Sequence, residues 1–344
     1  MTRKTMKVCL VGEYSGSRDE GMKNTASYLI RELSKHLEVL PLDVKSVFRK
    51  TFWKQLRSFK PQIIHYVPGP SLISFILAKV LSLYSSNAKV VMSAVHPSLS
   101  SVTRRFVSLL KPDLILTQSY DTEEMFNNLG LKTEFLPSGV DVERFIPVST
   151  EARNSLRDKY GLSREDFIVL HVGSIAGNRN LQVLPELQKM GNRVIIVGST
   201  STKMNRQVYQ MLKQGGCWVW TDYFENLEEV YALSDCYVFP TTDRIGCIEL
   251  PLSILEAMSC NLPVISTRFG AVPRVFEEGD GLFFIREETD FHPIIDSIKN
   301  GTMEIRTREK VLPYSWEKIA SKLGEVYEQL LTSNSCREPK ALCT

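Results

Sequence analysis

Between Val238 and Phe276 the chain alternates short apolar runs with polar turns and helical segments. The opening apolar run predicts a strand, and after a polar loop a helix of about ten residues begins with Pro251, which suits a first helical position. Asn261 closes that helix, and the run PVIS predicts a second strand. A turn at residues 267–271 leads into a further short helix. This repeat predicts a parallel α/β sheet, whose ligands bind beyond the carboxyl ends of its strands.

The same alternation runs through both halves of the chain. In the first half it predicts about six parallel strands, at residues 8–11, 39–42, 62–66, 89–93, 114–117 and 134–136. In the second half it predicts strands at residues 167–172, 193–197, 218–220, 236–239, 263–266 and 281–284. We therefore expect two doubly wound α/β domains. The final segment, YSWEKIASKLGEVYEQLL, repeats its apolar positions at helical spacing and predicts an amphipathic helix.

The composition is that of an ordinary globular protein. Of the 344 residues, 43% are hydrophobic and 24% are charged, and a chain of this length predicts two domains. The net charge of +3 is small for this length and indicates no nucleic-acid partner. Seven cysteines, an odd number with no C-x-x-C pair, indicate reduced thiols and a cytoplasmic protein. The five histidines lack the spacing of metal ligands, so we expect no metal site.

The longest apolar stretch, Leu72–Tyr84, is interrupted by Lys79 and is too short to span a membrane. It predicts a buried helix, with contact to a membrane surface as the alternative. The basic start MTRKTMK precedes an apolar run that is too short for the core of a signal peptide.

Several residues are candidates for binding. Gly12, Gly16 and Gly21 lie in the loop GEYSGSRDEG after the first strand, where they would permit close approach to a phosphate or sugar, or form a plain turn. Arg179 carries the only full positive charge of the loop GNRN; beside a helix N-terminus it suits a diphosphate, and otherwise it is a solvated loop residue. His96 follows a predicted strand end, where ligand-binding residues sit.

Glu256 stands on the border of the apolar stripe of its predicted helix, which contains Ile254, Leu255 and Met258. It is either a solvated boundary carboxylate or a carboxylate that faces a cleft and accepts hydrogen bonds from sugar or ribose hydroxyls. Helical spacing alone fits both interpretations.

Four segments, in this order, resemble the retaining glycosyltransferases of family 4. LPSGVDVERFIP resembles the segment between that family's two domains, and PLSILEAMSCNLPVIST resembles its most diagnostic stretch. RFGAVPRVF resembles the turn that follows, and YSWEKIASKLGEVYEQLL is similar to the family's last helix. The resemblance covers nearly the whole chain.

This resemblance implies the GT-B fold, with two Rossmann-like domains facing across a cleft. It implies an acceptor-side domain at residues 1–148, a nucleotide-sugar domain at 149–314, a helix at 315–332 that crosses back onto the first domain, and a polar tail at 333–344. The implied activity is metal-independent, retaining transfer of a hexose-type sugar from a nucleotide-diphosphate sugar, without a cofactor. The implied acceptor is a glycan, a lipid or a small molecule, with peripheral membrane contact at the inner face as a possible partner interaction.

The resemblance also implies roles for individual residues. Glu256 matches a glutamate that holds the nucleotide ribose, and His96 matches a histidine near the donor sugar. The loop with Gly12 and Gly16 matches one that faces the phosphates and the acceptor. Four residues match the turn whose backbone amides meet the donor: Phe269, Gly270, Ala271 and Val272.

The chain departs from the family pattern at several of these positions. Ile248 stands where the family carries its first glutamate, so Glu249, one place on, is the candidate catalytic carboxylate, with Asp243 as a second candidate. Ser174 replaces an arginine, while Arg179 matches a lysine and keeps its charge. A further change places an arginine, Arg274, where the following turn usually has a glutamate; it contacts phosphate or is solvated. The predicted catalytic set is therefore Glu249, His96 and Arg179.

Two other functions fit parts of the sequence. The departures at Ile248 and Ser174 also suit a weakly active or inactive relative that binds a nucleotide or sugar as a subunit or scaffold. A nicotinamide-dependent dehydrogenase fits the sheet pattern, but the chain lacks the G-x-G-x-x-G fingerprint and its acidic partner.

Overall fold

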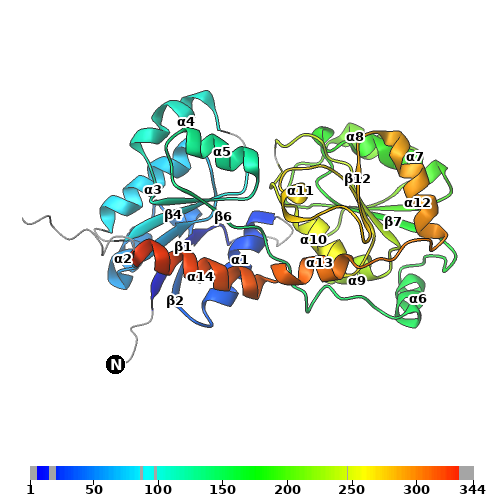
Figure 1. Ribbon diagram of the computed structural model, residues 1–344, viewed down its shortest axis with the longest axis horizontal. Helices are drawn as coiled ribbons and strands as arrows, with labels where there is room; N and C mark the ends of the chain where they lie inside the picture. The colour runs from blue at the N-terminus through cyan, green and yellow to red at the C-terminus, as the bar shows by residue number, and fades with distance from the viewer. Residues whose placement is uncertain (1–5, 15–20, 86–87, 97–98, 246, 333–344) are drawn as a thin grey trace, which may run out of the picture. The chain divides into compact units, whose positions relative to one another are not determined.

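The computed structural model describes residues 6–14, 21–85, 88–96, 99–245 and 247–332 (Figure 1). These residues form two compact units, each built on a six-stranded parallel sheet. The first unit combines the start of the chain, as far as Leu136, with the last helix from Trp316. The second unit contains Pro137–Ser315. The two sheets confirm the prediction of two doubly wound α/β domains.

In the first unit the strands follow the order β2-β1-β3-β4-β5-β6, and every neighbouring pair is parallel. Their bounds are β1 (Lys7–Gly12), β2 (Glu38–Asp43), β3 (Ile63–Tyr66), β4 (Lys89–Ala94), β5 (Leu114–Thr117) and β6 (Thr133–Phe135). The central strands are buried along their whole length and are rich in Val, Ile and Leu, as expected for a parallel sheet covered on both faces.

Helices cover both faces of this sheet. One apolar cluster joins the strands to Phe52 and Phe75, to Val107 and to Phe126. These residues come from α2 (Lys50–Phe59), α3 (Leu72–Tyr84), the 3-10 turn η2 (Val107–Leu109) and α5 (Tyr120–Asn128), while α4 (Ser101–Phe106) directly precedes η2. The segment from Ser101 to Leu109 is thus a short α-helix followed by a 3-10 turn.

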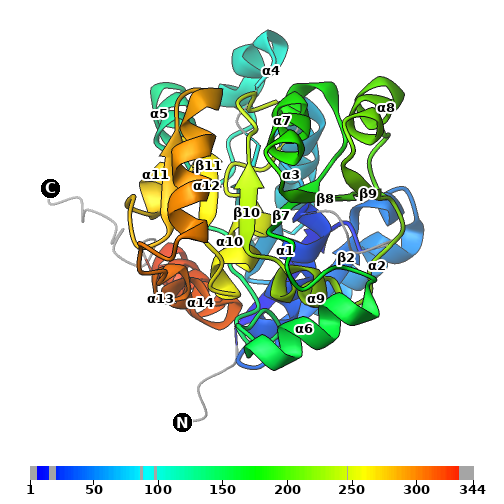
Figure 2. The same cartoon turned by 90° about the vertical axis from the view of Figure 1, so that its right-hand side faces the viewer.

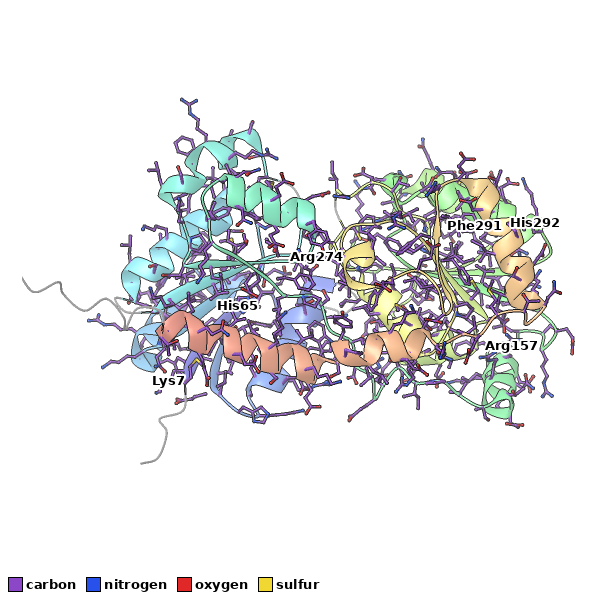
Figure 3. The ribbon with its side chains drawn as sticks, in the orientation of Figure 1. Lys7, His65, Arg157, Arg274, Phe291 and His292 are labelled. Carbon is purple, nitrogen blue, oxygen red and sulfur yellow. The ribbon has the colours of Figure 1, made fainter. Side chains whose placement is uncertain are left out.

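The other face carries α1 (Gly21–Leu33) and α14 (Trp316–Thr332). Trp316, the first residue of α14, stacks on Tyr28 of α1 with 5.2 Å between the ring centroids. Farther along α14, Tyr327 Oη lies 2.6 Å from His65 Nδ1, and His65 Nε2 lies 2.8 Å from Ser93 Oγ (Figure 3). Burial lowers the pKa of His65 to about 3, so its neutral ring pairs with both hydroxyls. The last helix of the chain is therefore an integral part of the first unit.

The second unit has the strand order β12-β11-β10-β7-β8-β9, and Figure 2 shows β11 to β9 from left to right. The bounds are β7 (Ile168–Gly173), β8 (Arg193–Gly198), β9 (Trp218–Trp220), β10 (Cys236–Phe239), β11 (Val264–Thr267) and β12 (Leu282–Ile285). The order in which the chain adds strands to the sheet reverses between β7 and β10. These two strands are parallel neighbours in the sheet but are not consecutive in the sequence. In doubly wound sheets such a switch point is where ligands bind.

Two groups of helices enclose this sheet. An apolar cluster on one face contains residues of α7 (Leu184–Lys189), α8 (Arg206–Gln214) and α12 (Phe291–Lys299). The crossovers from β9 to β12 contain α9 (Leu227–Ala232), α10 (Leu252–Ser259) and α11 (Val272–Val275). Pro251, predicted to be the first residue of α10, is instead its N-cap: its ψ of 126° is extended, although its φ of −62° would also fit a helix.

The second unit starts earlier than the predicted boundary at residue 148. Arg308, in α13 (Thr307–Val311), donates to the carbonyl oxygens of Val142 and Phe145, both at 2.9 Å. Ser259 Oγ donates to the Phe145 carbonyl at 2.6 Å. These bonds fasten the segment LPSGVDVERFIP to the second unit, so the division lies at Leu136. The predicted tail at residues 333–344 lies outside the described residues.

The helix α6 (Thr150–Lys159) is fixed to the second unit by one buried guanidinium (Figure 3). Arg157 is 4% exposed, and Asp235 Oδ2 accepts from its Nη2 at 2.6 Å. Its remaining N–H groups donate at 2.9–3.1 Å to the carbonyl oxygens of Leu233, Arg164 and Asp166. One side chain thus connects α6 to the loops that lead into β7 and β10.

Candidate functional site

Three loops leave the carboxyl ends of β7, β10 and β11 side by side, and hydrogen bonds connect them. Asn178 Nδ2 in the first loop donates to the Ile245 carbonyl in the second, at 2.7 Å. Thr241 Oγ1 donates to the Arg179 carbonyl at 3.4 Å, and Thr267 Oγ1 donates in turn to the Thr241 carbonyl. The edge of the sheet at its switch point is therefore a single bonded group of loops, which we call the switch-point loops (residues 174–180, 240–245, 247–251 and 268–271).

Arg179 places a positive charge inside this group of loops. It lies in the 3-10 turn η3 (Gly177–Arg179) and is only 9% exposed, so the alternative of a solvated loop arginine is wrong. Its charge acts on two neighbours. Burial raises the pKa of the Cys247 thiol, and the hydrogen-bonded Arg179 guanidinium works against that rise. Burial lowers the pKa of His171 to about 4, and Arg179 adds to that effect.

Glu249 belongs to the β10 loop and contacts the β11 loop, and it is almost completely buried, with 1% of its surface exposed. Its carbonyl oxygen accepts the amide N–H of Ala271 at 2.8 Å. Gly270 passes directly against the same carbonyl: a Cβ at Gly270 would lie 2.3 Å from the Glu249 oxygen, and its φ is +51°. Only glycine fits there without strain, so this contact fixes the backbone around Glu249.

The backbone amides of the turn after β11 are mostly used within the protein. Phe269 donates to Thr267 at 2.7 Å, Ala271 to Glu249, and Val272 to Phe269 at 3.0 Å. Within the described part of the chain, the Gly270 amide alone of these four donates to no protein acceptor. Phe269 also packs edge-on against the strand residue Phe239, with 5.2 Å between centroids. Of the four predicted donor-binding amides, that of Gly270 is the one directly available to a ligand.

Glu256 lies on α10, half-buried, and Tyr231 Oη donates to its Oε2 at 2.8 Å. Burial raises the pKa of this carboxyl to about 7, while the Tyr231 hydrogen bond and the charge of Arg144 oppose the rise. Partial burial and the hydrogen bond from the buried Tyr231 speak against the interpretation as a solvated boundary carboxylate. Glu256 can change its protonation state close to neutral pH.

The other predicted positions of the second unit lie in or beside the same loops. Ser174 is half-buried, and its Oγ accepts from Thr202 Oγ1 at 3.0 Å. Ile248 is half-buried, whereas Asp243 is exposed and accepts the Ile245 amide at 2.7 Å, as a turn residue does. Arg274 is half-buried on α11 (Figure 3). Glu249, and not Asp243, is thus the carboxylate that the fold holds inside the loops.

The predicted residues of the first unit lie at the carboxyl ends of its own strands. Gly12 ends β1, and a Cβ there would lie 2.7 Å from Tyr14 Oη, so the glycine lets the Tyr14 ring pack on the strand end. His96 follows β4 and is half-buried. Gly16 lies outside the described residues. Their roles remain predictions.

Sequence reasoning missed three side chains that shape these loops: Tyr231, Cys247 and Thr241. Tyr231 belongs to the apolar face of α9 and is fully buried, and its hydroxyl bonds to Glu256. Helical spacing does not distinguish it from the other core residues of α9. Cys247 and Thr241 lie in an irregular loop, where no periodicity reveals which side chains turn inward.

Two features are absent from the described residues. No three of their His, Cys, Asp or Glu side chains gather as a metal site would require. Among their helices, none has the length and apolar character needed to cross a membrane.

The sequence matches known proteins. Residues 166–300 match the family model of the glycosyl transferases group 1. A GDP-mannose-dependent monoacylated alpha-(1-6)-phosphatidylinositol monomannoside mannosyltransferase of Corynebacterium glutamicum is 25% identical over 216 residues, which are 57% of this chain and 56% of the relative. The gpi3 subunit of the phosphatidylinositol N-acetylglucosaminyltransferase of Schizosaccharomyces pombe is 23% identical over 90% of this chain and 72% of the relative. The chain thus spans little more than half of the first relative's length.

Solved structures share the whole fold. HepE of Anabaena, in complex with UDP, matches with a TM-score of 0.72 at 14% identity, over 94% of this chain and all of that one. At this identity the likeness concerns the fold alone: both units together have the GT-B fold, as expected from the sequence. The matched residues 166–300 contain all the switch-point loops. With the relatives named above, this match shows that residues 166–300 resemble the group 1 glycosyltransferases.

Proposed function

We propose that the chain is a retaining, metal-independent glycosyltransferase of family 4 that moves a sugar from a nucleotide-diphosphate sugar to a glycan, lipid or small-molecule acceptor. The observation that carries the proposal is the buried Arg179 within the switch-point loops, inside the family-matched range. A guanidinium in a water-poor loop attracts the phosphates of a donor and stabilises the charge that develops on the departing diphosphate. HepE, with the same fold, was solved with UDP and with UDP-glucose.

We assign some residues of the second unit to donor binding and others to catalysis. Glu256 accepts the ribose hydroxyls, Ser174 and the turn Phe269–Gly270–Ala271–Val272 surround the phosphates, and the free N–H in that turn is the one at Gly270. Glu249 serves the reacting end of the donor sugar, and Arg179 serves its leaving group. His96, Gly12 and Gly16 are assigned to the sugar and the acceptor on the resemblance alone. We place the protein in the cytoplasm, with peripheral contact to the inner face of the membrane.

The first experiment is a panel of nucleotide sugars, offered without added metal to the full chain. A transferase should be stabilised thermally by one donor and should slowly release its nucleoside diphosphate, because water replaces a missing acceptor. Stabilisation without release, even with candidate acceptors, would favour the alternative of an inactive relative that binds nucleotide or sugar. No stabilisation by any donor would contradict both.

Donor affinity should rise as the pH increases through about 7. The Glu256 carboxyl has a raised pKa of about 7, and its ionised form accepts hydrogen bonds from ribose hydroxyls more strongly than its neutral form does. The measurement is a titration with the stabilising nucleotide sugar, whose esterified phosphates do not change charge in this range. In Glu256→Gln the pH dependence should vanish, and an unchanged slope would remove Glu256 from the ribose site.

The same carboxyl affects stability with a definite sign. Its pKa in the folded protein is higher than in the unfolded chain, so the folded state binds more protons between the two values. Stability without ligand should therefore fall as the pH rises from about 4.5 to about 7. A Glu256→Gln chain should lose this contribution, which separates the effect on folding from the effect on binding.

A further inference from the structure

One part of the first unit combines exposed apolar side chains with a one-sided charge. Of the fifteen large hydrophobic side chains that are exposed among the described residues, nine lie between Phe48 and Leu109. Residues 44–112 contain eleven Lys and Arg and no Asp or Glu, while the rest of the chain has 31 basic and 39 acidic residues. Such a segregation is not expected for a surface that faces only water.

The apolar side chains share one side of α3. Ile73, Ile76, Val80, Leu83 and Tyr84 recur at helical spacing and are 42–75% exposed, while the opposite side of the helix, with Phe75 and Leu81, is buried on the sheet. This is why Leu72–Tyr84 is apolar all round. The prediction of a buried helix is correct for one side of α3 only.

The neighbouring helices continue this surface. Trp53 of α2 contacts Tyr84 at the end of α3, with 4.9 Å between centroids, and α4 lies on the other flank of α3 (Figure 1). From α4 and η2, Val102, Phe106 and Leu109 are 44–72% exposed. We call the outward side of α2, α3, α4 and η2 the α2–α4 face.

Cations surround these apolar side chains. Exposed Lys and Arg follow the outward sides of α2 and α4 and their ends: Arg49, Lys50, Lys54, Arg57, Lys60, Arg104, Arg105 and Lys111. Two other basic residues of the segment pair with acids outside it, Lys45 with Glu13 and Lys89 with Asp113. No acidic residue of residues 44–112 offsets the charge of the face, so its natural partner is anionic and apolar at once.

We propose that the α2–α4 face docks on an anionic lipid membrane, with the α3 side chains inserted between headgroups and the Lys and Arg on lipid phosphates. A lipid surface offers both chemistries in one plane. Phe48, Ile73, Leu83 and Leu109 are 72–97% exposed, so they project from the surface, and a fluid interface accepts projecting side chains without a shaped pocket. A second copy of the same face would oppose cation to cation. This inference deepens the proposed membrane contact by naming its surface.

Co-sedimentation of the full chain with vesicles tests this proposal without any donor sugar. The chain should bind vesicles of phosphatidylcholine mixed with phosphatidylglycerol, bind pure phosphatidylcholine much less, and dissociate as salt is raised. Arg104→Gln with Arg105→Gln should weaken binding roughly tenfold or more. Ile73→Ser with Leu83→Ser should also weaken it and should abolish what binding remains at high salt.

Matched controls come from the second unit. Arg206→Gln with Lys213→Gln removes two exposed cations of α8, and Ile146→Ser with Tyr223→Ser removes two exposed apolar side chains. Both should bind vesicles like the unchanged chain. Equal loss in controls and test variants would overturn the proposal, as would equal binding to both kinds of vesicle. A dimer that Ile73→Ser with Leu83→Ser dissociates would assign the face to a second copy instead.

Donor binding separates this proposal from the proposed function. The α2–α4 variants should keep the thermal stabilisation by the nucleotide sugar, because none of these residues belongs to the switch-point loops. Vesicle binding without thermal stabilisation by any nucleotide sugar would support the membrane surface and contradict the proposed transferase activity. Stabilisation by the donor without vesicle binding would support the transferase and contradict the membrane surface.

Discussion

Glu249→Gln should lower turnover by roughly 10²–10³-fold, the size expected when one electrostatic contribution to a transition state is lost. Glu249 is the buried carboxylate of the switch-point loops, and its backbone is fixed by the Ala271 hydrogen bond and by the close approach of Gly270. Glutamine keeps the size of the side chain and removes its charge. The measurement is release of nucleoside diphosphate from the donor that stabilises the unchanged chain.

Asp243→Asn is the matched control, since it neutralises the other candidate carboxylate of the same loop. Asp243 is exposed and accepts the Ile245 amide, a contact that asparagine can also make, so turnover should not change. Both variants should retain donor-induced stabilisation. Full activity in Glu249→Gln together with loss in Asp243→Asn would transfer the catalytic role to Asp243.

Arg157→Ala should destabilise the second unit by about 3–5 kcal/mol, because it leaves a buried carboxylate and three carbonyl oxygens without their donor. For a unit of this size that corresponds to a fall in melting temperature of roughly 6–20 °C. Thermal unfolding followed by tryptophan fluorescence would detect it, since Trp218 and Trp220 report from β9.

Arg153→Ala provides the comparison. Arg153 contacts the same Asp235 at 3.3 Å, but its side chain is 35% exposed. An ion pair of this kind contributes about 1 kcal/mol or less. A melting temperature that falls equally in both variants would mean that Asp235, and not the network of Arg157, determines the stability of this region.

Periodicity predicted the sheets well because parallel strands buried on both faces read as short apolar runs. Every strand of both units was expected within a few residues of its place. The boundary between the units was predicted less well, because LPSGVDVERFIP has no periodicity of its own and is held by Arg308 and Ser259, which are far away in the sequence.

The candidate site was predictable in position but not in detail. Strand order places Arg179, Glu249 and Phe269 at one edge, and the sequence pattern is enough to reveal that. The environment of Glu256 depends on Tyr231 from another helix, and the burial of Arg179 depends on the path of an irregular loop. Side-chain contacts between distant segments of this kind leave no signature in helical or strand spacing.

The place of α14 has a consequence for how the protein is made on the ribosome. The first unit receives its last helix only after the entire second unit has been synthesised, because Trp316 and Tyr327 follow it in the sequence. Until then, the face of the sheet around His65 lacks the partner that covers it. The second unit, encoded in one continuous stretch from Pro137, can finish first. Nascent chains that end before Trp316 therefore leave the face of the sheet around His65 uncovered.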